Sequence, residues 1–191
     1  MIIGTSIEHE AFSDHEEDIE HSDYWVHYWE KQNHAEDQFI GRYFNLDSMS
    51  ESDHEEQVEE WLESLTEATG RECTEYIVSE VSDEVPRQFV TKSGLSSDFF
   101  EMMEIVEKRY PQITVEICLA GLECGLQLHQ IEEEYKGEFD SDSEFAQDYA
   151  EGLGLARGDV QWPYQHIDWV AAAEELTDEF VSHEGHYFRN V

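Results

Sequence analysis

Residues 52–70 read SDHEEQVEEWLESLTEATG and predict an amphipathic helix. The apolar side chains follow the i, i+3, i+4, i+7 spacing of a helix face that packs on a core: Val58, Trp61, Leu62 and Leu65. Ser52 and Glu55 are spaced as a capping box, and Gly70 is placed to end the helix in a left-handed turn. Seven carboxylates and no lysine or arginine occupy the rest of this stretch.

This charge pattern does not help the helix to form. Pairs of opposite charge four residues apart stabilise a helix by a few tenths of a kcal/mol, and like charges destabilise it by as much. A helix of residues 53–69 would be roughly 26 Å long. Double-stranded DNA carries about fifteen charges over that length, of which about half face one side. Seven carboxylates are of the same order, so the helix can present a phosphate-like display.

The flanking segments predict an α+β fold. YWVHYWE (24–30) and QFIGRYFNL (38–46) read as a strand pair, and CTEYIVSEV (73–81) as a third strand. Residues 97–110 predict a helix with an apolar face of Phe99, Met102, Met103 and Val106. Residues 113–135 predict one interrupted helix or two short ones. Further helices are expected after Ser141, with Glu144 completing a capping box, and after Asp168. Residues 185–191 read as a terminal strand or an extended segment.

These patterns predict an elongated chain in four parts. Residues 1–23 form an acidic arm, mobile or loosely docked, and residues 24–85 a small α+β domain. Residues 86–130 form a central helical domain, and residues 131–191 an acidic α+β domain. In the last part, the expected apolar stripe of the helix after Asp168 comprises Trp169, Ala172, Ala173, Leu176 and Phe180.

Charge separates the possible classes of function. The 191 residues include 47 acidic and 10 basic side chains, for a net charge of −37, and 24 aromatic residues that favour a folded chain. Nucleic acids and anionic membranes would be repelled, so cationic protein surfaces are the expected partners. No apolar run reaches the length of a membrane span and no signal peptide opens the chain, which predicts a cytoplasmic protein. The three cysteines, without a CxxC pair, favour reduced thiols.

No motif for catalysis, a cofactor or a metal site is found. Residues 140–151 match the oxygen positions of a calcium loop, but Phe145 replaces the required glycine, so a capped helix is expected. The ten histidines include no HExxH pair. We expect no enzymatic activity, no cofactor and no metal. Because the histidines lie among many acids, we expect raised pKa values for them and weaker binding to a basic target below about pH 6.

Three stretches resemble the C-terminal region of the ArdA family of antirestriction proteins: IEEEYKGEFDSDSEFAQDYAEGLG (131–154), HIDWVAAAEEL (166–176) and EGHYFRN (184–190). The resemblance covers about residues 131–190, is weaker over 24–85, and over 86–130 is limited to helical, acidic character. The first 23 residues and EKQNHAED (30–37) depart from the family pattern. The resemblance implies a dimeric DNA mimic, encoded by phage or plasmid, that occupies the DNA-binding cleft of type I restriction-modification enzymes without catalysis or cofactor.

The expected mimic surface combines the acid-only helix faces with the acids of the resembling region. Two alternatives remain open: an acidic chaperone that shields basic proteins, and an acidic protein of other function from a high-salt proteome. The acids assigned to the surface are Asp53, Glu56, Glu59, Glu60, Glu63, Glu67, Glu101, Glu104, Glu132, Glu133, Glu134, Asp140, Asp142, Glu144, Asp148 and Glu151.

Overall fold

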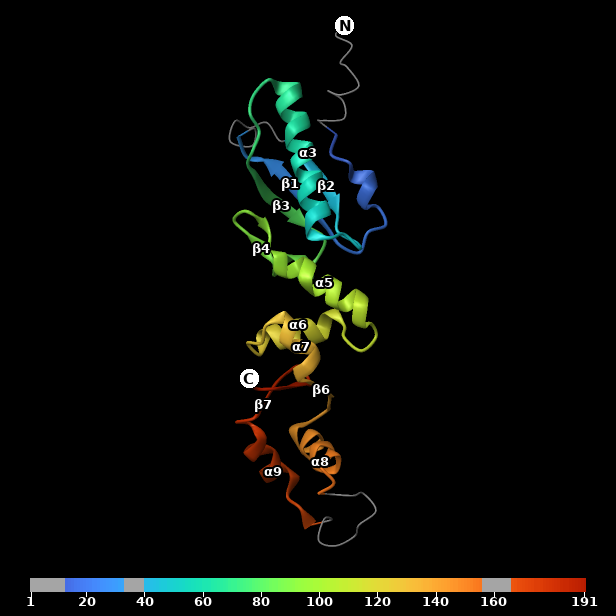
Figure 1. Cartoon of the computed structure of the whole chain (residues 1–191), viewed down its shortest axis with the longest axis vertical. Helices are drawn as coiled ribbons and strands as arrows, with labels where there is room; N and C mark the ends of the chain where they lie inside the picture. The colour runs from blue at the N-terminus through green and yellow to red at the C-terminus, as the bar shows by residue number, and fades with distance from the viewer. Residues whose placement is uncertain (1–12, 33–39, 156–165) are drawn as a thin grey trace. The chain divides into compact units, whose positions relative to one another are not determined.

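A computed structural model describes residues 13–32, 40–155 and 166–191. Helices and small antiparallel sheets alternate along the chain, which confirms the α+β class (Figure 1). The chain divides into two compact units, residues 1–107 and 108–191, and each is described by itself. The division falls inside the segment 86–130 that the sequence assigned to a central domain.

A three-stranded sheet forms the centre of the first unit. Its strands are β1 (Trp25–Glu30), β2 (Gly41–Asn45) and β3 (Tyr76–Val81), in the order β2-β1-β3. Both pairings are antiparallel, and Trp25 pairs with Asn45 at one end of the β1–β2 ladder. The predicted strand pair and third strand are therefore confirmed.

Helix α3 (Glu51–Thr69) packs its apolar side on this sheet (Figure 1). All four predicted stripe residues are buried, and the ring of Trp61 lies 5.8 Å from that of Phe44 on β2. Gly70 ends the helix with a φ of 67°, as predicted. The predicted start is wrong: Ser50, two residues before Ser52, caps the helix by accepting the Asp53 N–H at 3.2 Å.

The chain between β3 and the next long helix is more structured than the sequence indicated. It contains the one-turn helix α4 (Glu84–Arg87) and a hairpin of β4 (Val90–Thr91) and β5 (Gly94–Leu95). Helix α5 (Ser97–Arg109) then buries Phe99, Phe100 and Met102. Phe100 was not assigned to the apolar face, whereas Met103 and Val106, which were, are only half-buried.

Residues 13–23 are attached to the sheet. They include the short helix η1 (Glu16–Ile19), which packs beside β2. The Tyr43 N–H donates to the Asp14 carbonyl at 2.9 Å, and the Asp47 carboxylate accepts the backbone N–H groups of Asp23 and Tyr24. This part of the predicted arm is docked, and residues 1–12 lie outside the described residues.

The second unit combines two helical pairs with a small sheet. Helices α6 (Val115–Glu123) and α7 (Leu128–Glu134) are separate, as one of the two predicted arrangements required. The sheet has the order β6-β8-β7, from β6 (Tyr135–Glu138), β7 (Phe180–His183) and β8 (His186–Arg189). Helices α8 (Asp142–Gly152) and α9 (Trp169–Leu176) begin at the predicted caps, Ser141 and Asp168.

An aromatic cluster forms part of the core of the second unit. Phe145 of α8 stacks on Tyr187 of β8, with ring centroids 4.5 Å apart, and Phe180 packs edge-on against Phe145. The predicted stripe of α9 is wrong in part, because the helix ends at Leu176 and Phe180 instead opens β7. Within α9 only Ala173 is buried.

All three cysteines are free thiols, as predicted. Cys73 and Cys118 are buried, and Cys124 is half-buried. In the described part of the chain, no helix combines the length and apolar character that crossing a membrane requires.

Candidate functional site: acid-only helix faces

The exposed side of α3 consists almost entirely of carboxylates. The helix is longer than predicted and carries eight acids with no lysine or arginine. All eight are exposed, including every member of the predicted surface on this helix. At 100° per residue, the seven acids from Asp53 to Glu67 cover roughly 160° of the circumference, opposite the buried stripe. The sheet holds the helix by that stripe, so the carboxylates sit on a fixed support.

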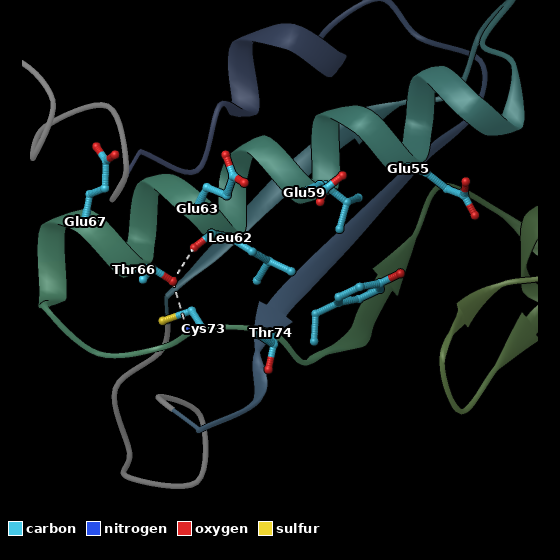
Figure 2. A pocket seen from close by; sticks show the side chains of 10 residues that line it. Glu55, Glu59, Leu62, Glu63, Thr66, Glu67, Cys73 and Thr74 are labelled. Atoms are coloured by element: carbon cyan, nitrogen blue, oxygen red, sulfur yellow. Dashed lines mark hydrogen bonds between the residues drawn. The ribbon is translucent and has the colours of Figure 1, made fainter.

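The acids of α3 flank two hollows in the surface. Glu55, Glu59, Glu63 and Glu67 stand in a row beside a groove between α3 and the segment that enters β3 (Figure 2). On the other flank, the following residues border a smaller hollow of about 450 Å³: Asp47, Ser48, Met49, Asp53, Glu56, Gln57 and Glu60. Glu51 and Glu55 were not assigned to the surface. Their spacing was nevertheless visible in the sequence, because Glu51, Glu55 and Glu59 follow one another at intervals of four residues.

The charge density of α3 matches that of one side of a duplex. Nineteen residues span about 28 Å, and DNA carries about seventeen phosphates over that length. About half of those phosphates face one side, and the helix carries eight carboxylates. The match concerns charge per length, and it depends on the absence of any base in the helix.

Helix α5 adds two predicted acids to the first unit. Glu101 and Glu104 are both exposed, three residues apart on the helix and therefore on one face. Phe99, Phe100 and Met102 are buried from the same helix, so the carboxylates occupy its solvent side.

The three predicted acids of α7 differ in their surroundings. Glu132 accepts a hydrogen bond from Arg109 Nε at 2.9 Å, which neutralises its charge locally. The Glu134 side chain is only 15% exposed, with its carboxylate 3.9 Å from Lys136 Nζ. Glu133 is exposed. Glu132 and Glu134 therefore each have a basic residue beside them, and the assignment of the three acids to the mimic surface stays a prediction.

Helix α8 carries a second acid-only face. Glu144, Asp148 and Glu151 are exposed at i, i+4 and i+7, roughly opposite buried Phe145 and Ala146.

Two other predicted acids at the start of α8 have internal roles. The Asp142 carboxylate accepts a short hydrogen bond from the Tyr187 hydroxyl, so it is committed to the fold of the unit. Asp140 is exposed, and its backbone N–H donates to the Glu144 carboxylate at 2.9 Å. Glu144 thereby takes part in closing the start of the helix while remaining exposed.

Two histidines contradict the expectation of raised pKa values. His54 lies inside the first unit between α3, the sheet and α5, and burial lowers its pKa to about 4. Burial also lowers the pKa of His27, against the raising effect of Asp14 and Glu80. The negative field does not dominate at these positions because both side chains are shielded from solvent and the charged form loses its hydration.

The structure contains no group that resembles a metal centre in the residues it describes: no three His, Cys, Asp or Glu side chains are arranged to hold an ion. The calcium-loop-like stretch 140–151 forms the capped helix α8, as expected.

Comparisons with protein-family models, with curated proteins and with solved structures found no match. The resemblance to the ArdA family therefore rests on the quoted stretches of sequence alone.

Proposed function

We propose that this protein is a DNA-mimic antirestriction protein that occupies the DNA-binding cleft of a type I restriction-modification enzyme. The observation that carries the proposal is the outer face of α3, where seven of the helix's eight exposed carboxylates stand on a packed helix without a single base. A DNA-binding cleft is lined with lysine and arginine that contact phosphates. Carboxylates spaced at a density similar to that of DNA phosphates can form ion pairs with the same lysine and arginine side chains.

A fixed anionic face also accounts for the expected kinetics. Complementary charge accelerates encounter, and screening by salt weakens both the attraction and the complex. The α8 face of Glu144, Asp148 and Glu151 supplies a second anionic element in the other unit. In this proposal the protein works by occupancy as a homodimer in the host cytoplasm, and it performs no catalysis and uses no cofactor.

The proposal is tested by competition. A purified type I methyltransferase is bound to its labelled recognition duplex, and the protein is added at low ionic strength. We expect displacement of the DNA, and a steep loss of displacement as salt rises. DNA that stays fully bound at a large excess of protein would contradict mimicry.

A matched pair of variants separates shape from net charge. The α3 variant carries Glu56→Gln, Glu60→Gln and Glu63→Gln, and the control carries Glu123→Gln, Glu174→Gln and Glu175→Gln, all exposed in the second unit. Both lose three charges. At 0.2–1 kcal/mol for each exposed pair, we expect the α3 variant to need about tenfold more protein for half-displacement. The control should change little.

The same assay addresses the alternative of a general acidic chaperone. A protein that only shields basic surfaces would bind histones, polylysine and the methyltransferase with equal affinity, and its two triple variants would weaken equally. A DNA mimic prefers the DNA-shaped cleft, so its affinity for the methyltransferase should exceed the other two.

A further inference from the structure

A groove runs along the first unit between α3 and the chain that enters β3. It has a volume of about 760 Å³. Val58, Leu62 and Tyr76 contribute apolar surface, and the carboxylates of Glu55, Glu59, Glu63 and Glu67 line the helix side (Figure 2). The ten described residues that line this groove include four acids and no lysine or arginine. A ligand for it must therefore combine positive charge with apolar surface.

The far wall of the groove is an open sheet edge. Among the described strands, β3 pairs with β1 alone. The backbone carbonyl of Glu75 accepts the Lys31 N–H at 2.9 Å, so the backbone groups of Glu75 point toward the β1 side. Because backbone groups of successive residues in an antiparallel ladder alternate in direction, those of Tyr76, the first residue of β3, turn away from β1. An open edge of this kind can pair with an added extended segment.

Local hydrogen bonds hold the groove in shape. The Thr66 hydroxyl donates to the Leu62 carbonyl at 2.9 Å and accepts the Cys73 N–H at 2.9 Å (Figure 2). These bonds fix the chain after α3 against the helix. Burial and the nearby charge of Glu55 raise the pKa of Tyr76, so its phenol stays protonated and can donate a hydrogen bond. The groove thus needs little rearrangement to receive a ligand.

The spacing of the carboxylates matches an extended chain. Residues four apart on a helix rise by about 6.0 Å, so the row from Glu55 to Glu67 covers about 18 Å. Side chains on one side of a strand repeat every two residues, at about 6.6 Å. Residues four apart also turn by about 40° round the helix, so Glu55 and Glu59 lie nearest the groove, and Glu63 and Glu67 are turned progressively away from it. Alternate lysine or arginine side chains of an extended peptide can therefore reach Glu55 and Glu59.

We propose that this groove binds an extended peptide segment of a partner protein with lysine or arginine at alternate positions and small apolar or hydroxyl side chains between them. The cationic side chains pair with Glu55 and Glu59. The aliphatic stems of these cationic side chains cover the apolar floor, the intervening side chains point to the opposite face of the sheet, and the peptide backbone pairs with the open edge at Tyr76. This binding site does not depend on DNA mimicry, because it uses one flank of α3 and a sheet edge rather than a duplex-like display.

The test uses a synthetic peptide with lysine at positions 1, 3, 5 and 7 and threonine or valine between, titrated into the full chain at low ionic strength. The peptide control has the same composition with its four lysines adjacent. We expect the alternating peptide to bind more tightly and to shift the amide NMR signal of Tyr76. Glu55→Gln with Glu59→Gln should weaken its binding about tenfold.

A matched variant on the same helix controls for net charge. Glu56→Gln with Glu60→Gln removes two charges from the opposite flank, and glutamine preserves helix propensity in both variants. This variant should bind the alternating peptide nearly as well as the wild type. Equal weakening by both variants, or equal affinity for the two peptides, would overturn the proposal. Neither outcome bears on DNA competition, so failure here is distinguishable from failure of the proposed function.

Discussion

Lowering the pH should destabilise the first unit through His54. This residue is 4% exposed, its Nε2 lies 3.1 Å from the Tyr28 hydroxyl, and the rings of Phe44 and Phe100 lie within 6 Å. Burial lowers its pKa from 6.5 to about 4. In the unfolded chain the imidazole takes up a proton near pH 6.5, whereas in the folded chain it resists until about pH 4. Acidification therefore favours unfolding.

The size of the effect follows from linkage. Stability from neutral His54 is fully present above the unfolded pKa and is lost as pH falls from about 6.5 towards 4. The complete loss corresponds to about 3 kcal/mol, and between about pH 7.5 and about pH 5 it amounts to about 2 kcal/mol. A loss of this size is a large fraction of the 5–15 kcal/mol typical of a domain.

Urea unfolding of the wild type and of His54→Leu, followed by tryptophan fluorescence at both pH values, measures this contribution. The variant loses the bond to Tyr28, so its absolute stability differs. Both proteins contain the same carboxylates, so the contribution of these groups to the pH dependence of the unfolding free energy cancels when the wild type is compared with the variant. The wild type should lose about 2 kcal/mol more than the variant on acidification. Identical changes would refute the assignment of this sensitivity to His54.

Three further outcomes are expected. Gly41→Ala should cost on the order of 2 kcal/mol in urea unfolding, because a Cβ would lie 2.5 Å from the rings of His27 and Trp29; Gly152→Ala, with open space around it, should cost almost nothing, and equal effects would contradict the packing. Tyr187→Phe should lose about 1 kcal/mol by removing the bond to Asp142, measured by thermal melting, and an unchanged melting curve would count against that bond. Iodoacetamide should modify half-buried Cys124 before Cys118, whose pKa burial raises to about 12; mass spectrometry showing the reverse order would contradict this.

Long periodic segments of this chain were predictable from sequence. The stripe of α3 and its end at Gly70 were identified correctly, because four large apolar side chains at helical spacing have one efficient way to be buried. The three strands of the first sheet were also identified, since their β-branched and aromatic residues leave little choice.

The errors arose where two local signals compete. Ser50 and Ser52 are both good N-caps, and the capping-box pattern favoured Ser52, but the first turn begins earlier and Ser50 accepts the Asp53 N–H. Phe180 has the helical spacing of α9, yet it pairs in β7 because Tyr187 and Phe145 provide its apolar contacts. The hairpin of β4 and β5 has only two residues in each strand, too few for a periodic pattern.

The candidate site was predictable in composition and less so in detail. The acids on the free face of α3 were identified from helical spacing, and those of α8 from the stretch that resembles the ArdA family. Sequence spacing could not show that Arg109 reaches Glu132 across 23 residues, or that Asp142 is bonded to Tyr187. Tertiary contacts also decide the histidines, because the surroundings of His54 come from three separate elements.

The lack of any base on α3 gives ionic strength two opposed effects on this molecule. Counterions relieve the repulsion between neighbouring carboxylates, so added salt should help the helix to stay folded. The same counterions screen the attraction between the carboxylates and a cationic partner, and so weaken the binding of that partner. Added salt should therefore stabilise the helix and weaken binding to a cationic partner of the kind proposed. Under the proposed function, we expect capture to be strongest at an intermediate salt concentration.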